Sequence, residues 1–521
     1  MGVKRHNTEN PEETYLDLYT KPMRRDIILS TINAKWIHPS LALRLLKANL
    51  GPLEERCEII EFTLRQPLDE KVSAIMAAAP CVVGFSVSIW NHTATIELLE
   101  ALETKWAAGT AAASTDYAPA AGHETTAEKN PRPVIVLGGP EVSWLPPDAA
   151  IFRYANFIIR GEAEHEFRKI CDQVLSGREA RHDDHSLQRV DVNSIKTAYH
   201  LYTAADLGGK LIYVESSRGC PFNCEFCLSS VKTESVAENA GTQNTAARQQ
   251  VRFFPLEQFL AEMNILIERG VRTIKFLDRT FNLDIKRAIQ ILEFFLDKID
   301  ERKKVSPIPF VVHFEMVPSR FPMELCETLS RFPPGTLRLE IGIQTLNAEV
   351  SAHIGRPSEP ERELETLRFL REKTGAIIHA DLIAGLPGED FASFASGFDR
   401  LWAALFSQPQ AAHPRNEIQL GILKLLPGAP LARLSTAFGM RYNSSPPYEI
   451  TETAVMSAHD LNRIKNFARF WELIVNRGLL NCDETPVFAK FMALSDSLLA
   501  RFGRNWGIDK SELRQELGKI I

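Results

Sequence analysis

Three cysteines at short spacing are the residues of this sequence best suited to chemistry. Cys220, Cys224 and Cys227 are separated by three and two residues. Four thiolates would complete an iron–sulfur cube or a zinc site, whereas three leave one metal position open for a reactant. The spacing therefore indicates a reactive metal centre.

The other cysteines supply no second group of ligands. A zinc ribbon, the structural alternative, needs a further pair of Cys or His at comparable spacing. The remaining cysteines each stand alone: Cys57, Cys81, Cys171, Cys326 and Cys482. We therefore favour an iron–sulfur cluster over zinc, which stays open as the alternative.

The elements around the cysteines predict a partial barrel. Residues 211–215 form an apolar run typical of a buried strand, so the thiols lie on the loop that follows it. Further strands are expected at 273–277, 310–314, 337–343, 377–383 and 417–423. Helices such as 256–269 and 286–298 separate them, and six such units are too few for a closed eight-stranded barrel.

Polar residues occur where these strands end. In barrels the loops at the carboxyl ends of the strands converge on one mouth, so side chains there are candidates for the site. They are Asp278, Glu315, Gln344 and Asp381. The fifth strand continues into a turn that contains Gly385, Pro387 and Gly388, and glycine there permits close approach of the backbone to a planar ligand. An ordinary strand–helix connection is the alternative for this turn.

The cysteine loop resembles the radical S-adenosylmethionine (SAM) superfamily, whose signature is C-x3-C-x2-C on the first barrel loop. The resemblance implies a 4Fe-4S cluster whose open iron binds SAM and whose electron cleaves it to a 5′-deoxyadenosyl radical. It also implies that Asp278 and Glu315 are catalytic carboxylates near SAM, and that Gln344, Asp381 and the glycine turn bind this cofactor. The family's Gly-Gly-Glu after the second strand is replaced here by residues 277–279, Leu-Asp-Arg.

The N-terminal third predicts a second kind of sheet. Strands expected at 26–30, 57–62, 81–86, 134–138 and 157–160 alternate with helical patterns at 41–50, 68–79, 93–105 and 162–175. This alternation predicts a doubly wound parallel sheet, whose ligands bind beyond the carboxyl ends of the strands. Three loops lie there, and their candidate binding residues are Asn33, His38, Ser86, Ser88, Trp90, Gly138, Gly139 and Glu141.

Residues 82–91 and 134–143 resemble cobalamin-binding domains that precede radical SAM cores. In that family the serine loop and the double glycine admit the nucleotide tail of the corrinoid. The D-x-H-x-x-G motif that places a histidine beneath cobalt is absent, and His38 is followed by Pro39. His38 as a cobalt ligand is thus one alternative, and a capping or packing role is the other. Trp90 and Trp36 are expected either on the corrin or in the core.

The domain organisation follows from these patterns. We expect a disordered tail (1–22), a cobalamin-binding Rossmann-like domain (23–180, with an insertion at 107–132), a linker (181–205), a radical SAM partial barrel (206–430, with an insertion at 232–250) and a mainly helical C-terminal domain (431–521). Residues 33–42, 276–282 and 419–424 resemble a branch of the family with a C-terminal helical domain of uncharacterised role.

Bulk properties limit the possible partners. The chain has 521 residues, a formal charge of -6 and a pI near 6.2, so nucleic acid is not expected as a partner. No apolar run suggests a membrane span, and the eight cysteines without a secretory signal predict a cytoplasmic protein.

The expected function is that of a cobalamin-dependent radical SAM enzyme. By resemblance, the reaction is methylation of an unactivated carbon in a small-molecule or peptide substrate, with an electron donor such as flavodoxin or ferredoxin. One alternative is a radical rearrangement or oxidation in which cobalamin carries no methyl group. Another is a corrinoid and iron–sulfur sensor without enzymatic activity.

Overall fold

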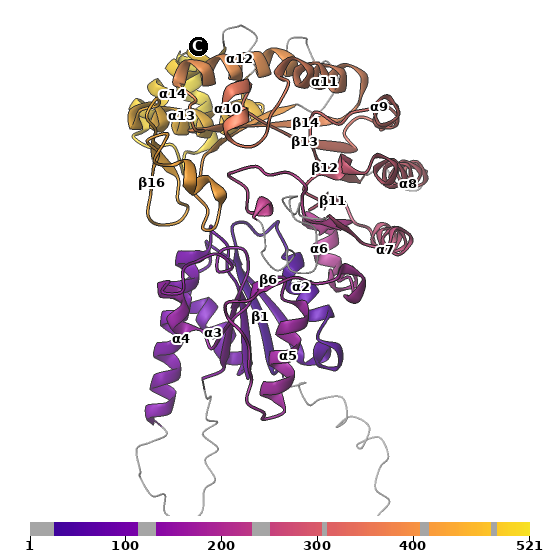
Figure 1. Ribbon diagram of the computed structural model, residues 1–521, viewed down its shortest axis with the longest axis vertical. Coiled ribbons are helices and arrows are strands. Elements are labelled where there is room, and N and C mark those ends of the chain that lie inside the picture. Colours follow the sequence, from indigo (N-terminus) through magenta and orange to yellow (C-terminus); the bar gives the residue numbers. More distant parts are fainter. Residues whose placement is uncertain are drawn as a thin grey trace, which may run out of the picture.

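The structure, a computed structural model, describes residues 25–112, 132–231, 251–304, 310–406, 416–480 and 487–520. The predicted tail at 1–22 and most of the predicted insertions at 107–132 and 232–250 lie outside these residues. Two parallel sheets organise the described part, one in the lower body of Figure 1 and one in the upper body. The predicted fold class is confirmed.

The first sheet is doubly wound. Its strands are β1 (Ile27–Asn33), β2 (Cys57–Thr63), β3 (Val82–Ser86), β4 (Val134–Gly138) and β5 (Phe157–Ile158), all parallel in the order β2-β1-β3-β4-β5. Helices α3 (Leu68–Ala78) and α4 (His92–Ala112) cover the face that carries Ile28. Helices α2 (Leu41–Ala48) and α5 (Glu164–Leu175) cover the face that carries Ile27. The strand order reverses between β1 and β3, which is where such sheets bind ligands.

A connection after α5 leads to the second sheet. It contains the two-residue strand β7 (Leu187–Gln188), which pairs with β6 (Arg160–Gly161) before α5, and helix α6 (Ala204–Gly209). Arg44 of α2 donates to Asp206 of α6 at 3.1 Å and to Glu61 of β2 at 2.9 Å, and all three side chains are largely buried. This charged group fixes the first sheet to the start of the second.

The second sheet is the predicted six-stranded partial barrel. Its parallel strands are β8 (Ile212–Val214), β11 (Thr273–Phe276), β12 (Val311–Met316), β13 (Leu337–Gln344), β14 (Ile377–Ala384) and β15 (Glu417–Ile422), in that spatial order. Helices α7 (Leu256–Glu268), α8 (Ile285–Lys303), α9 (Met323–Ser330), α10 (Ala348–His353), α11 (Pro360–Lys373) and α12 (Phe391–Phe406) belong to it. Figure 1 shows α7, α8 and α9 along the outer side of the sheet.

Strand β13 shows why this sheet has two different faces. Leu337, Leu339, Ile341 and Ile343 are buried, whereas the residues between them are partly exposed. Successive side chains of a strand point to opposite faces, so the apolar set packs under the helices and the polar set lines the concave side. The concave side is therefore a polar surface that can hold ligands.

The C-terminal helices continue the core of the barrel. They are α13 (Ala458–Trp471), α14 (Val487–Phe502) and α15 (Lys510–Ile520), preceded by the short strands β16 (Arg441–Tyr442) and β17 (Ile450–Glu452). Phe398 of α12 lies edge-on to Trp471 of α13, with 4.8 Å between ring centroids. Because one hydrophobic cluster spans the barrel and these helices, the boundary predicted at residue 430 stays a prediction.

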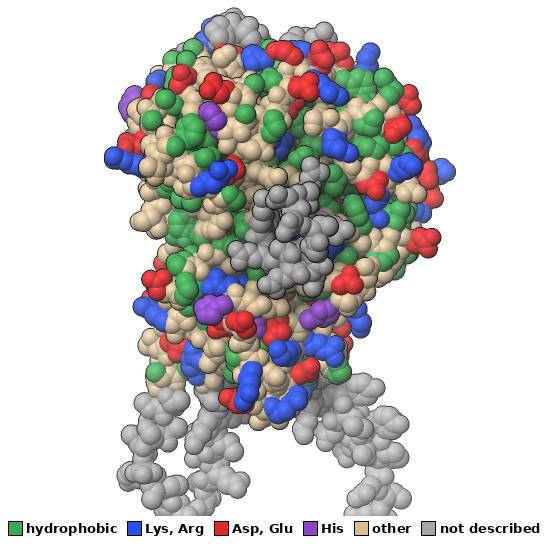
Figure 2. Space-filling view, viewed as in Figure 1, with side chains coloured by type: hydrophobic (Ala, Val, Ile, Leu, Met, Phe, Trp, Pro, Cys, Tyr) green, Lys and Arg blue, Asp and Glu red, His purple; other side chains and the backbone are tan. Residues whose placement is uncertain are grey.

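The surface is mixed in charge. On the face drawn in Figure 2, acidic and basic side chains are interspersed over both bodies. In the part of the chain that the structure describes, no helix is both long and apolar enough to cross a membrane.

Candidate active site

The three cysteines of the motif lie together on the loop that follows β8 and β9 (Ser217–Arg218). Their thiols are free, Cys224 is buried, and Cys220 and Cys227 are partly exposed. The N–H of Cys227 donates to the carbonyl of Cys224 at 3.0 Å, and the Ser230 hydroxyl lies 2.8 Å and 2.6 Å from the carbonyls of Cys224 and Cys227. The loop is thus shaped by its own backbone.

The donor set fits a cluster better than a single ion. Within the described residues, no three His, Cys, Asp or Glu side chains form a group that could hold one metal ion. A mononuclear zinc site needs such convergence, whereas a cluster takes one thiolate for each iron it binds. Cys220, Cys224 and Cys227 would therefore hold a cluster and leave its fourth iron open.

Asp278 anchors this loop. Its carboxylate accepts from the N–H of Ser216 at 2.9 Å and from the hydroxyls of Ser216 and Ser217, both at 2.6 Å. Its side chain is almost fully buried, and burial raises its pKa. Both oxygens already have protein partners, so the geometry favours a positioning residue over the catalytic carboxylate expected from the sequence.

Arg356 is a residue that the sequence analysis missed. It follows α10, and its guanidinium reaches back to the cysteine loop, where Nη1 lies 3.9 Å from Sγ of Cys224. Burial raises the pKa of the Cys224 thiol, and the charge of Arg356 acts in the opposite direction. A Cβ on the preceding Gly355 would lie 2.6 Å from the Asn223 carbonyl, which explains the glycine. The pair Gly355-Arg356 was the signal in the sequence that could have indicated this contact.

Three predicted residues, Glu315, Gln344 and Asp381, lie in the carboxyl-terminal halves of barrel strands. Burial raises the pKa of Glu315 and raises that of Asp381 well above its ordinary value. Oδ1 of Asp381 is buried without a hydrogen-bond partner in the structure. Gln344 has a φ of 70°, uncommon for a residue other than glycine and frequent at functional sites. These polar groups remain available to a ligand.

A second polar group lies deeper on the same face and was not predicted. Glu340 accepts from Lys275 Nζ at 2.7 Å and lies 3.2 Å from Nε2 of His313. Burial opposes its charge, but the nearby imidazole of His313 and the charge of Lys275 lower its pKa to about 2. The neighbouring His379 is driven to a pKa of about 3, mainly by burial. In the sequence these residues occupy alternate positions of strands and belong to no recognisable motif.

The glycine turn after β14 packs closely against other parts of the protein. Gly385 has a φ of 87°, and a Cβ there would lie 2.7 Å from Cγ2 of Ile450 and 3.3 Å from Leu461. Gly388 also has a φ of 87°, with Nδ1 of His353 3.2 Å from the Cβ position. The carbonyl of Pro387 lies 3.2 Å from that same nitrogen. These glycines thus permit close approach of protein, largely of the C-terminal segments, and the expected contact of the turn with a planar ligand stays a prediction.

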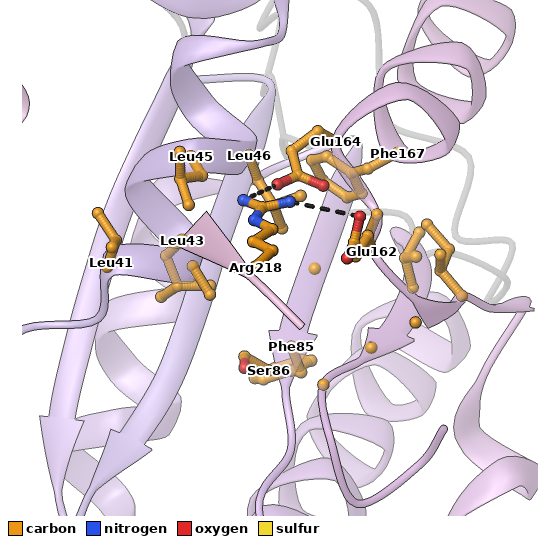
Figure 3. A pocket seen from close by; sticks show the side chains of 18 of the residues that line it. Leu41, Leu43, Leu45, Leu46, Phe85, Ser86, Glu162, Glu164, Phe167 and Arg218 are labelled. Atoms are coloured by element: carbon orange, nitrogen blue, oxygen red, sulfur yellow. Dashed lines mark hydrogen bonds and ion pairs between the residues drawn. The ribbon is translucent and has the colours of Figure 1, made fainter. Parts of the chain in front are cut away.

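A pocket of about 250 Å³ opens beyond the carboxyl ends of β3 and β4. Ser86, Gly138 and Gly139 line it together with leucines of α2 and with Phe167 of α5 (Figure 3). Gly139 has a φ of 103°, and a Cβ there would lie 2.6 Å from the Val87 carbonyl, so its backbone requires glycine. Gly138 has no protein atom closer than 3.6 Å to its Cβ position, so a side chain there would enter the pocket.

Arg218 joins this pocket to the barrel. Its Nη2 donates to Glu164 of α5 and to Glu215 after β8, both at 2.7 Å, and Nη1 lies 3.5 Å from Glu162. Figure 3 shows the guanidinium between Glu162 and Glu164 at the edge of the pocket. The three carboxylates raise the pKa of Arg218, so its positive charge is secure.

A second pocket, of about 400 Å³, extends from the first to the cysteine loop. The two pockets share Ser86 and Gly139, and the second also reaches Gly219 and Leu228 beside the cysteines. The pocket at the loops predicted to bind a corrinoid therefore adjoins a pocket that reaches the loop predicted to bind a cluster.

Other predicted residues of the first sheet already have protein partners. Nδ2 of Asn33 donates to Glu61 at 3.1 Å. Nδ1 of His38 lies 2.8 Å from the hydroxyl of Tyr213 in β8, so this nitrogen is occupied by an interdomain hydrogen bond. Burial, Lys35 and Lys275 lower the pKa of His38. The geometry favours the packing alternative for His38 over cobalt ligation.

The last three candidates of the first sheet differ in exposure. The buried Ser88 donates through its N–H to Asn91 at 2.8 Å, which shapes the loop after β3. Glu141 is buried and accepts from Tyr448 at 2.6 Å, with Nδ1 of His92 at 2.8 Å. Trp90 is 53% exposed and Trp36 59%, so the core alternative for both rings is wrong.

Comparisons with known proteins agree with this geometry. Residues 214–400 match the radical SAM superfamily. A relative named uncharacterized methyltransferase PH0819, from Pyrococcus horikoshii, is 26% identical over 277 residues, which cover 49% of this chain and 54% of that protein. The chain thus spans about half the length of this curated relative.

Two solved enzymes share the arrangement of both sheets. The radical SAM methyltransferase TsrM from Kitasatospora setae, solved with cobalamin and a 4Fe-4S cluster, has a TM-score of 0.54 at 15% identity and covers 81% of this chain and 78% of its own. OxsB, a cobalamin-dependent SAM radical enzyme solved with aqua-cobalamin and SAM, has a TM-score of 0.58 at 13% identity and covers 96% and 75%. Residues 214–400 of this protein are therefore a domain of the radical SAM superfamily, and the chain has the fold of these two enzymes.

Proposed function

We propose that this chain is a cobalamin-dependent radical SAM enzyme that methylates an unactivated carbon of a small-molecule or peptide substrate. One observation carries the proposal. The pocket bounded by Ser86 and Gly139 adjoins a second pocket that reaches the cysteine loop, so a corrinoid and a cluster would bind beside each other. A sensor would need neither these adjoining pockets nor the buried, unpartnered carboxyl oxygen of Asp381 in the barrel.

Each cofactor has a set of residues that fits it. The three cysteines would hold the cluster, Glu315, Gln344 and Asp381 would contact SAM, and the pocket at Gly138 and Gly139 would take the corrinoid tail. When bound, the cluster with SAM would supply hydrogen-atom abstraction, and cobalamin would supply the transferable methyl group.

The protein's own groups have three tasks in this scheme. Asp278 and Arg356 hold the cysteine loop in shape. The buried oxygen of Asp381 offers an acceptor to a hydroxyl or ammonium group of a ligand. Arg218 and its carboxylates close the side of the cavity between the sheets, which restricts the access of water to reactive species.

The relatives support methyl transfer over the other radical outcomes. Both TsrM and the relative from Pyrococcus horikoshii are named methyltransferases. The reduction step would require a partner such as flavodoxin or ferredoxin, and we expect a cytoplasmic setting with neither nucleic acid nor membrane as partner.

The decisive experiment measures two products of SAM. Anaerobically reconstituted enzyme with cobalamin and a strong reductant should form both 5′-deoxyadenosine and S-adenosylhomocysteine. A variant with alanine at Cys220, Cys224 and Cys227 should lose 5′-deoxyadenosine but keep S-adenosylhomocysteine when cobalamin is reduced chemically. Formation of 5′-deoxyadenosine alone, with substrate and full cobalamin loading, would replace methylation by a rearrangement or oxidation. Neither product from loaded protein would favour the sensor.

A further inference from the structure

The chain makes a long excursion after the last barrel strand. Residues 426–448, here called the strut, leave the edge of the barrel and return to it. Leu425 donates to the Tyr448 carbonyl at 3.0 Å and Ile450 donates to the Leu423 carbonyl at 2.9 Å, which closes the base of the excursion. In Figure 1 the orange chain near β16 extends from the upper body toward the first sheet.

One part of the strut holds the cysteine loop. Glu225 lies between Cys224 and Cys227, and its carbonyl accepts from the N–H of Leu431 at 2.8 Å. Its carboxylate accepts from Nε of Arg433 at 2.9 Å and is also paired with Nη2 of that residue. On the other side, the N–H of Glu225 donates to the carbonyl of Ile354 at 2.9 Å. The middle of the cysteine motif is therefore fixed from two directions.

Another part of the strut holds the loop after β4. Tyr448 donates to the buried carboxylate of Glu141 at 2.6 Å. Burial and this carboxylate raise the pKa of Tyr448, so the hydroxyl keeps its proton and remains a donor. Gly428, with a φ of 82°, packs so closely on Trp144 that a Cβ would lie 2.8 Å from that side chain. The loop that carries Glu141 and Trp144 begins at Gly139, which borders the pocket.

We propose that the strut is a positioning element, which sets the cysteine loop relative to the loop at 139–144. Each of these loops leaves a different sheet, and the strut contacts both through specific side chains. The assignment of cofactors to the two loops rests on the proposed function. Two reacting centres that act on one substrate must keep a fixed separation, because a displacement of about 1 Å can slow a reaction roughly 100-fold.

Two substitutions test the strut without touching a cysteine or a pocket residue. Gly428→Ala would push the strut away from Trp144, and Tyr448→Phe removes the hydrogen bond to Glu141. Gly503→Ala is the matched control for the glycine, because Gly503 also has a positive φ, 65°, but no atom within 4 Å of its Cβ position. For the contact with Glu225, Arg433→Gln should loosen the cysteine loop as Tyr448→Phe loosens the loop at 139–144. Arg433→Lys should keep part of the wild-type behaviour, because it retains the positive charge.

Two measurements decide the outcome. In cofactor-free protein, hydrogen exchange at residues 139–144 and 220–228 should rise roughly 10-fold or more in the strut variants, for about 1.4 kcal/mol of lost local stability. In loaded protein, pulsed EPR should give a shifted or broader distance between the reduced cluster and cobalt(II), with iron content and cobalamin retention unchanged. A distance distribution that matches wild type and Gly503→Ala overturns the proposal. If wild type binds neither cofactor, the proposed function fails. The strut is then tested by hydrogen exchange alone, and exchange in the cofactor-free variants that matches wild type overturns its positioning role.

Discussion

Asp278 gives the sharpest test of the site, because sequence and structure assign it different roles. The sequence analysis placed its carboxylate on SAM, whereas the structure directs it to Ser216 and Ser217. Asp278→Asn keeps one oxygen for the two hydroxyls but turns an amide toward the N–H of Ser216. Asp278→Ala removes every acceptor.

The magnitude follows from these three contacts. A buried donor without a partner costs about 1–3 kcal/mol, but hydroxyls rotate to other acceptors and the backbone N–H does not. Burial raises the pKa of Asp278, so part of its hydrogen bonding only offsets the burial of its charge. We therefore expect a loss of local stability of about 1–2 kcal/mol for the asparagine variant and about 2–4 kcal/mol for alanine.

Hydrogen exchange at Ser216 and Ser217 measures this loss in the cofactor-free protein. The alanine variant should exchange roughly 30- to 1000-fold faster at these amides, and it should bind less iron on reconstitution. Asp297→Asn, on the exposed side of α8, is the control and should change neither quantity. Normal exchange and full iron content together with weakened SAM cleavage would refute the positioning role and restore the expectation from the sequence.

Three further predictions concern the pocket at Gly138, His38 and His379 of β14. Gly138→Leu should place a side chain in the pocket without straining the backbone, so gel filtration with cobalamin should show reduced retention while the melting temperature holds. His38→Ala should leave the cobalt EPR spectrum of bound cobalamin unaltered, because Nδ1 of His38 faces the hydroxyl of Tyr213, and Tyr213→Phe should also leave it unaltered. Loss of a nitrogen hyperfine signal in His38→Ala alone would establish that His38 ligates cobalt. His379 has its folded pKa lowered to about 3, so the unfolded chain gains a proton first as the pH falls below 6.5 and stability drops. By pH 4.5 the loss in free energy of unfolding amounts to about 2–3 kcal/mol. Denaturant unfolding of the cofactor-free protein should show this loss, and His379→Gln should lack it.

Strands and helices could be predicted where the pattern was long and periodic. The alternation in β13 and the apolar runs of β1 and β4 fixed their bounds to within a few residues, because burial on one or both faces dictates the residue type at each position. The pairs β6–β7, β9–β10 (Arg252–Phe253) and β16–β17 were not predicted. Their strands have two or three residues each, and so short a strand has no period to detect.

The site divides in the same way. A local motif such as the cysteine loop can be predicted from the sequence, because its spacing within eight residues indicates the chemistry. Contacts between residues distant in the sequence cannot be predicted in this way. Asp278 contacts Ser216, 62 positions away, and Arg356 contacts Cys224, 132 positions away. The polar group around Glu340 is an intermediate case, since the alternation of strands placed its members on one face but not in contact.

The glycines show where this limit lies. A glycine next to or near a proline in a loop predicts a turn or a close approach, and the structure contains a close approach at Gly139, Gly385 and Gly428. The identity of the approaching group is set by tertiary packing, and it proved to be a backbone carbonyl, an isoleucine and a tryptophan in turn. Gly138 differs because its Cβ position meets little protein, so it is the glycine at which a ligand can supply the close contact. Gly138 is therefore the position at which substitution tests binding, whereas substitution at Gly139 tests only the backbone.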